Sequence, residues 1–150
     1  VRVLMRNGEW PDARQWFNQL LVRDPVSPTT RACEGLLHLQ EGAPGLAVEA
    51  FERLVEQTPN DASAWTNLAV AYLRLARTDR AQKALAHAQA LQPESAVWHN
   101  TRGLLAAQTQ QWEEAHAEWQ RSLELEPNFE AAMINLDRLK QRQPPFHDAQ

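Results

Sequence analysis

Few side chains in this 150-residue chain have a type and spacing suited to catalysis or metal binding. Glu113 and His116 form an E-x-x-H pattern, the spacing with which di-iron helix bundles hold metal. Such a site needs a second E-x-x-H pattern and further carboxylates, and the sequence has no second pattern. Glu34 and His38 are four residues apart, which favours a local contact over a pair of metal ligands. We therefore interpret Glu113 and His116 as part of a solvated helix face.

Motifs for nucleophilic or cofactor chemistry are also missing. Cys33 is the single cysteine, so the sequence allows neither an intrachain disulfide nor a cysteine-based metal site. A small residue in a helix groove explains Cys33 better than a nucleophile does. The chain lacks the motifs G-x-x-x-x-G-K-[ST], G-x-G-x-x-G, G-x-S-x-G and H-E-x-x-H. We predict that the protein is not an enzyme and uses no cofactor and no metal.

Composition narrows the class of partner. Apolar residues make up 43% of the chain, enough for a packed core. The net charge of −4 argues against nucleic acid, because surfaces that neutralise phosphates are usually strongly basic. No stretch approaches the length of apolar sequence that spans a membrane, so we expect no transmembrane helix. One cysteine fits a reducing cytoplasm and equally a periplasmic domain, so the localisation stays unknown.

The elements that position these side chains follow from an internal repeat. Prolines recur every 34 residues, at Pro25, Pro59, Pro93 and Pro127. A proline ends a helix because it has no N–H to donate and clashes with the preceding turn. Small residues at the same period let two helices approach closely, and a large apolar residue fills the space between them. These columns are Gly35, Ala69 and Gly103; Ala13, Ala47, Ala81 and Ala115; and Phe17, Phe51, Leu85 and Trp119.

The second repeat carries the clearest pattern. Its residues Trp65, Leu68, Ala69 and Tyr72 lie on one helix face, followed by Ala81, Leu85, Ala88 and Pro93. Residues 62–95 therefore resemble a tetratricopeptide repeat, whose pattern is W-x2-L-G-x2-Y, A-x3-F and a late proline. Residues 28–61 and 96–129 resemble it with departures, since His38 and His99 stand where aromatic residues normally pack. The resemblance implies an all-α fold, a right-handed superhelical solenoid of antiparallel helix pairs.

The repeat predicts the organisation of the whole chain. We expect helices at 12–23, 29–40, 45–57, 62–75, 79–91, 96–108, 112–125 and 130–142. Residues 1–27 form a partial repeat, with Val1 to Asn7 as the second half of a first helix. Whole repeats follow at 28–61, 62–95 and 96–129. Residues 130–142 form a polar capping helix, and residues 143–150 a flexible tail.

The open N-terminal end favours a natural protein that extends upstream. It also allows packing on another copy, so homo-oligomerisation through this end is an alternative.

The family resemblance implies a partner-binding groove, because the first helix of each pair lines the concave face. Counted from residues 28, 62, 96 and 130, the lining places are 2, 5, 6, 9, 12 and 13. We predict partner contacts from Leu36, Leu39, Gln40, Thr66, Asn67, Val70, Leu73, Arg74, Asn100, Thr101, Leu104, Gln108, Asn135 and Arg138. The remaining lining residues are Thr29, Ala32, Cys33, Ser63, Val97, Ala107, Ala131 and Ile134.

An apolar strip runs along this predicted groove, because place 9 holds Leu36, Val70 and Leu104. Asn67 and Asn100 lie beside it, and asparagine both donates and accepts hydrogen bonds. This combination suits an amphipathic helix or an extended peptide with apolar anchors. The alternative is that the apolar residues are core, over which the superhelix closes.

One known ligand class is disfavoured. Some family members bind acidic chaperone tails through a clamp of Lys, Asn, Asn, Lys and Arg. Only the asparagine at Asn67 matches that clamp, and a shift by one repeat improves nothing. The other clamp places hold Ala32, Leu36, Val97 and Thr101.

The sequence leaves the roles of two of the tryptophans open. Trp112 stands where the family often has tyrosine, which indicates packing. Trp16 and Trp98 lie outside the usual core columns, so each either is exposed as an interaction anchor or fills a gap between repeats.

We predict a protein–protein interaction module, a scaffold or adaptor that holds a peptide or helix, in a bacterial assembly or maturation complex. The alternative is a regulatory or targeting domain of a larger enzyme whose catalytic part lies upstream.

Overall fold

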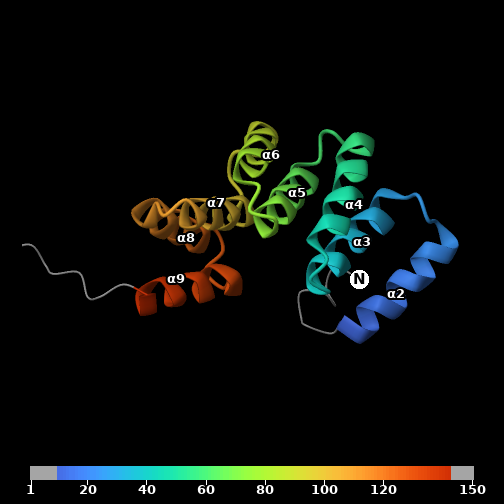
Figure 1. The fold of residues 1–150 in the computed structure, drawn as a ribbon, viewed down its shortest axis with the longest axis horizontal. Helices are drawn as coiled ribbons and strands as arrows, with labels where there is room; N and C mark the ends of the chain where they lie inside the picture. Colours follow the sequence, from blue (N-terminus) through green and yellow to red (C-terminus); the bar gives the residue numbers. More distant parts are fainter. Residues whose placement is uncertain (1–9, 143–150) are drawn as a thin grey trace, which may run out of the picture. The chain divides into compact units, whose positions relative to one another are not determined.

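The computed structural model describes residues 10–142, which form eight α-helices and no strand. Their bounds are α2 Trp10–Arg23, α3 Pro28–Gln40, α4 Pro44–Gln57, α5 Ala62–Arg74, α6 Thr78–Leu91, α7 Ala96–Gln108, α8 Trp112–Leu125 and α9 Glu130–Arg142 (Figure 1). Each predicted helix lies within two residues of these bounds, and the all-α repeat fold is confirmed. The predicted remnant of a first helix and the predicted tail lie outside the described residues.

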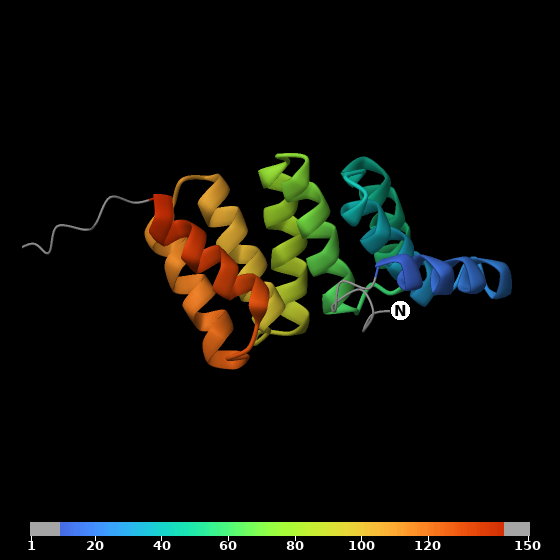
Figure 2. The same ribbon diagram turned by 90° about the horizontal axis from the view of Figure 1, so that it is seen from below.

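The chain divides into two compact units, which are considered separately. Unit 1 extends to Leu91 and contains α2 to α6, and unit 2 begins at Gln92 and contains α7 to α9. In unit 1, α3 packs on α4 and α5 packs on α6 as helix pairs, and α4 also packs on α5 (Figure 2). In unit 2, α7 packs on α8, and α8 packs on α9.

Helix starts follow local chemistry. Asp61 Oδ1 accepts the backbone N–H of Ser63 at 2.9 Å, and Ser95 Oγ accepts the N–H of Trp98 at 3.3 Å. Each of these side chains satisfies a donor that the first helical turn leaves unpaired. Pro28 and Pro44 occupy first-turn positions, where the missing N–H costs nothing.

Close approach within each helix pair depends on the small-residue column. A Cβ added at Gly35 would lie 2.5 Å from the Phe51 ring, well inside van der Waals contact. Gly103 meets the Trp119 indole in the same way in unit 2. The alanines at Ala47, Ala81 and Ala115 are fully buried. The small-residue columns therefore mark the places where the backbone of one helix contacts a side chain of its partner helix, as predicted.

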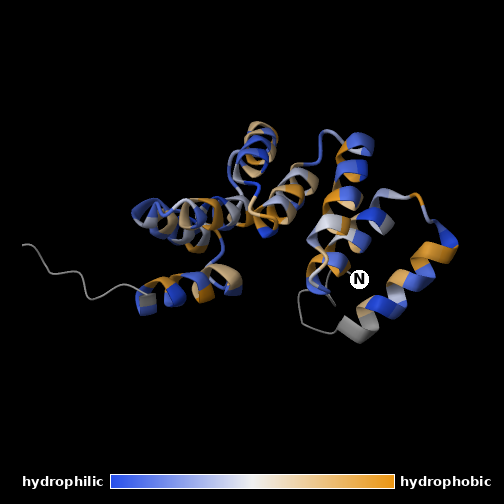
Figure 3. Ribbon diagram, viewed as in Figure 1, coloured by the Kyte–Doolittle hydropathy of each residue, from blue (hydrophilic) through white to orange (hydrophobic). Residues whose placement is uncertain are grey.

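Each unit has its own apolar core. In unit 1, a cluster of Ala13, Cys33 and Leu37 joins α2 to α3. In unit 2, Trp119 of α8 and Leu136 of α9 belong to one buried cluster. Apolar and polar positions alternate along the helices at helical spacing, so each helix has a side for the core and a side for water (Figure 3). Among the described helices, none is long and apolar enough to cross a membrane.

Candidate partner-binding surface

In unit 1, the open side of α5 is a single stripe of four predicted groove residues. Ser63, Asn67, Val70 and Arg74 are spaced by four, three and four residues, which aligns them along the helix. Ser63 and Arg74 are exposed, and Asn67 and Val70 are half-buried. The stripe therefore offers a hydroxyl, an amide, an apolar side chain and a cation in order along the helix.

The corresponding side of α3 is more apolar. Leu36 and Leu39 are half-buried, and Gln40 is exposed at the end of the helix. Leu36 also packs against the cluster that joins α2 to α3, so only part of its side chain faces outward. Thr29 is exposed at the start of α3, and Cys33 is 1% exposed.

Some predicted groove residues are buried within their own unit. Thr66 is 3% exposed and donates from Oγ1 to the Ala62 carbonyl at 2.9 Å. Thr101 is 1% exposed and donates to the Val97 carbonyl at 2.8 Å. Leu73 is 8% exposed. The hydroxyl groups of Thr66 and Thr101 are satisfied by carbonyls of their own helices. All three side chains face the interior of their unit.

In unit 2, an amide pair joins the two helices that carry the predicted groove. Asn135 Nδ2 of α9 donates to Asn100 Oδ1 of α7 at 3.0 Å. Asn100 is buried, and Asn135 is half-buried. Val97 on α7 and Ile134 on α9 are each 41% exposed. Exposed apolar side chains therefore accompany the amide pair on both helices.

The rest of this surface of unit 2 combines apolar and polar side chains. Leu104 and Ala107 pack partly against the unit 2 core cluster. Gln108 and Arg138 are exposed at the ends of their stripes. The open side therefore changes from apolar to polar along each helix.

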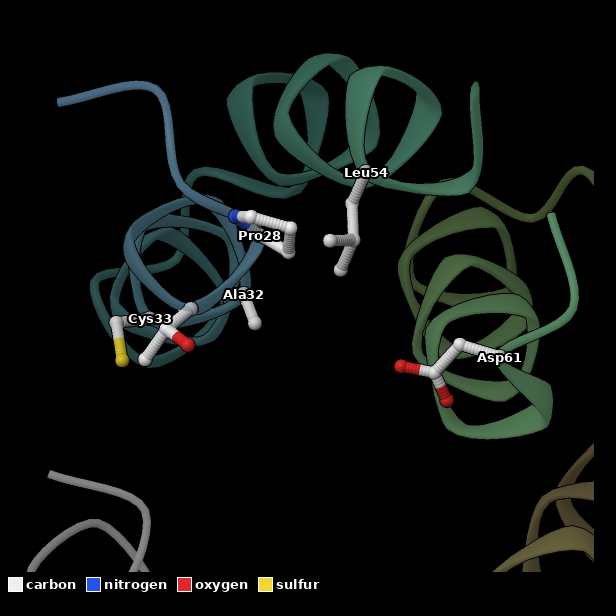
Figure 4. Close-up of a pocket in the computed structure, with 6 residues that line it drawn as sticks. Pro28, Ala32, Cys33, Leu54 and Asp61 are labelled. Atoms are coloured by element: carbon white, nitrogen blue, oxygen red, sulfur yellow. The ribbon is translucent and has the colours of Figure 1, made fainter. Parts of the chain in front are cut away.

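A pocket lies on the predicted groove side of unit 1, with a volume of about 110 Å³. Its lining comes from α3, α4 and the residue that caps α5. In Figure 4, Leu54 projects from α4 between Pro28 and Ala32 on one side and Asp61 on the other. Thr29 and Cys33 complete the lining. Sequence reasoning placed Thr29, Ala32 and Cys33 in the groove but missed Leu54 and Asp61, which occupy places 27 and 34.

Charged groups between the paired helices hold those helices together. His99 Nδ1 and Glu118 Oε2 are 2.7 Å apart, and Arg102 forms an ion pair with Glu114. Both pairs join α7 to α8. His38, the other histidine that replaces an aromatic residue, lies within 4.0 Å of Glu34 on its own helix.

In unit 1, the Tyr72 hydroxyl donates to Glu52 Oε1 at 2.6 Å. Burial raises the pKa of Tyr72, and the bond to Glu52 raises it further.

No group of three or more metal-binding side chains gathers anywhere in the described part of the chain. Glu113 is exposed and His116 half-buried on the surface of α8.

The tryptophans differ in how far the structure exposes their side chains. Trp98 is 6% exposed and fills space in unit 2, whereas Trp16 is 53% exposed on α2. Trp112 packs against the core cluster of unit 2, as predicted.

Comparison with known proteins identifies the family. Two family models, both described as tetratricopeptide repeat, match residues 38–107 and 96–129. The chain is a tetratricopeptide-repeat protein. Proteins of this repeat class use extended surfaces of stacked helices to bind partners.

Several solved structures have the same fold. TTC0263, a thermophilic tetratricopeptide-repeat protein of Thermus thermophilus, is 26% identical with a TM-score of 0.81. The match covers 92% of this chain and 76% of that chain. The first tetratricopeptide domain of Spaghetti (RPAP3), bound to the HSP90 peptide SRMEEVD, is 27% identical with a TM-score of 0.64. That match covers 76% of this chain and 90% of that chain.

One curated relative is much longer. Essential for maintenance of the cell wall protein 1 of Saccharomyces cerevisiae is 31% identical over 100 residues, which is 65% of this chain. The chain matches 11% of the length of that relative.

Proposed function

We propose that this tetratricopeptide-repeat protein is a protein-interaction module. The surface that we propose for a peptide or helix of a partner in unit 1 is the open side of α3 and α5. The surface that we propose in unit 2, considered by itself, is the open side of α7 and α9. The observation that carries the proposal is the pair Val97 and Ile134, each 41% exposed beside the Asn100–Asn135 amide pair. Apolar anchors next to amide groups suit a peptide, whose backbone needs hydrogen bonds and whose side chains need burial.

The peptide-bound RPAP3 domain supports this function, because it is similar in sequence and fold and holds a peptide. The acidic chaperone tail itself is not the ligand we propose. Ala32, Val97 and Thr101 stand at clamp places where that ligand class needs Lys, Lys and Arg, and Leu36 stands where it needs Asn. The setting we propose is a bacterial assembly or maturation complex.

Site-specific photo-crosslinking tests the proposal. A benzophenone amino acid is placed at Ser63, which is exposed on the open stripe of α5, and separately at Gln82, which is exposed on α6. In extracts of the native organism, the probe at position 63 should capture one partner peptide that the probe at position 82 does not. Mass spectrometry then identifies the crosslinked segment. Equal capture from both positions, or none from position 63, contradicts the proposal.

Substitutions on the stripes provide the second arm. Leu36→Asp and Val70→Asp should abolish binding at the surface of unit 1, and Leu104→Asp should abolish binding at the surface of unit 2. Far-UV circular dichroism should stay nearly unchanged, because part of each side chain faces outward. Ala90→Asp, at an exposed position of α6, is the matched control and should bind normally. Binding that survives all three substitutions excludes the open stripes as the site.

A further inference from the structure

The pocket of unit 1 has a size that selects among side chains. Its volume is about 110 Å³, and Pro28, Ala32 and Leu54 give it an apolar wall. An enclosed apolar cavity of about 150 Å³ holds a benzene ring. The pocket is smaller, so an aliphatic side chain of the size of valine or leucine fits it better than an aromatic ring.

One carboxylate stands at the rim of this pocket. Asp61 is exposed, and its Oδ1 is engaged with the N–H groups of Ser63 and Ala64 at 2.9 and 3.4 Å. Within residues 10–142, Oδ2 accepts no hydrogen bond and Asp61 has no ion-pair partner. A cation that reaches the rim would therefore meet an unpaired negative charge.

The equivalent places of unit 2 are filled differently. Ser122 replaces Leu54, is fully buried, and donates to the Ala96 carbonyl at 2.8 Å. Phe129 replaces Asp61 and packs against the unit 2 core cluster. The combination of an apolar wall with a rim carboxylate thus belongs to residues 28–61 and is not a consequence of the fold alone.

We propose that this pocket selects a segment of the partner in which valine, isoleucine or leucine is followed directly by lysine or arginine. The aliphatic side chain enters between Ala32 and Leu54, and the cation pairs with Asp61 Oδ2. The inference rests on the proposed function and names the chemistry of its ligand. It also reverses the charge of the ligand bound by the chaperone-tail clamp.

Defined peptides test this chemistry without the native partner. The probes are four octapeptides with blocked ends, GSGLKGSG, GSGLQGSG, GSGLEGSG and GSGFKGSG, titrated into the protein and followed by amide NMR. GSGLKGSG should shift signals of Thr29, Ala32 and Asp61 saturably. The glutamine peptide should bind about threefold more weakly, because an exposed ion pair contributes little. The glutamate and phenylalanine peptides should bind more weakly still.

Two variants and a control separate the contributions of charge and volume. Asp61→Asn keeps the helix cap, since asparagine caps as well as aspartate, and should erase the preference for lysine over glutamine. Ala32→Leu fills the pocket and should weaken the leucine peptides about tenfold. Asp79→Asn makes the same charge change at an exposed position of α6 and should leave all affinities unchanged.

Either of two results overturns the inference: no binding by GSGLKGSG, or a preference for lysine that persists in Asp61→Asn. The second result remains decisive even if Ala32→Leu fails to fold. Crosslinking from Ser63 reports on the interaction module independently. Peptide failure with successful crosslinking therefore overturns the pocket chemistry alone, whereas failed crosslinking overturns the proposed function.

Discussion

The helix pairs α5/α6 of unit 1 and α7/α8 of unit 2 have the same register but different contacts. In α5/α6, Trp65 stacks on His87 with ring centroids 4.5 Å apart. His99 stands 34 residues after Trp65, and it contacts Glu118 at 2.7 Å instead. Ala84, the equivalent of Glu118, is 3% exposed. The place that carries a ring stack in one pair thus carries a contact between a histidine and a carboxylate in the other.

The small-residue column varies only between glycine and alanine, since Ala69 holds this place in α5. Gly35 in α3 and Gly103 in α7 both lie directly against an aromatic ring of the partner helix. At these two glycines a single added carbon would overlap the ring, so a close approach of the backbone needs glycine at one place in each unit. Positions around that contact accept either apolar or charged pairs, since the helices already lie close enough for both.

Substitution of the two glycines should lower the free energy of unfolding more than any other change proposed here. Gly35→Val and Gly103→Val should each lower the free energy of unfolding by about 3 kcal/mol, because the new side chain overpacks a filled interface. Urea denaturation followed by circular dichroism measures the loss. Gly45→Ala is the control, since nothing lies within 4 Å of a Cβ at that position. A cost below about 1 kcal/mol at either interface would show that its helices can separate without penalty.

Trp119→Phe should have the next largest effect, because it makes unit 2 resemble unit 1. The Trp119 indole N–H donates to the backbone carbonyl of Asn100 at 3.1 Å. Phe51 occupies the equivalent place of residues 28–61 and has no N–H to donate. Loss of this buried hydrogen bond should cost about 1.5 kcal/mol in urea denaturation. Trp112→Phe, which removes an indole packed against the same cluster, is the control. If Trp119→Phe and Trp112→Phe lower the free energy of unfolding equally, the stabilisation by Trp119 comes from the volume of its ring and not from its hydrogen bond.

A double-mutant cycle addresses the contact between His99 and Glu118 directly. His99→Trp and Glu118→Ala together copy Trp65 and Ala84 into unit 2. Each single change should destabilise, because the first places an indole against the Glu118 carboxylate and the second leaves His99 without its partner. The double change should recover about 1 kcal/mol of the summed loss, as expected for residues in contact. Additive costs would show that the two places are not coupled.

The smallest expected effect concerns Tyr72, which lies in unit 1 and is the single tyrosine of the chain. Burial and then the bond to Glu52 raise the pKa of Tyr72 above its ordinary value of 10.0. A raised pKa means that the folded state favours the neutral phenol. This contribution to stability is therefore complete below pH 10.0 and is lost as the pH rises through the folded pKa.

Tyrosinate absorbance measures this pKa without interference from another tyrosine. Glu52→Gln should lower the pKa of Tyr72 towards 10.0, because the neighbouring negative charge disappears. Glu49→Gln, at an exposed position on the same helix, should leave the titration unchanged. An unchanged midpoint in Glu52→Gln would leave burial as the sole cause.

Most of the fold could be predicted from the sequence, because a repeat of 34 residues states the same local rules several times. Prolines, small residues and apolar faces are local signals, and they located every described helix to within two residues. The caps Asp61 and Ser95 are local features of the same kind, since a cap acts within the first turn of its own helix. The family followed from the same columns.

Which groove residues face outward was decided by the tertiary structure. Thr66 and Thr101 turn back onto their own helices, and Leu73 is buried in unit 1, although all three occupy predicted groove places. Trp16 and Trp98 have equal apolar character, yet one is exposed and the other buried. Exposure depends on what the neighbouring helices cover, and spacing along one helix carries no information about that.

The pocket at Asp61 arises in the same way. It needs Leu54 from α4 and a cap residue of α5 to meet α3, three segments that are separate in the sequence. The sequence by itself determined where helices begin, end and approach closely, because those are local properties of the repeat. Packing between elements alone decided which surfaces stay open, because burial is a property of the assembled helices.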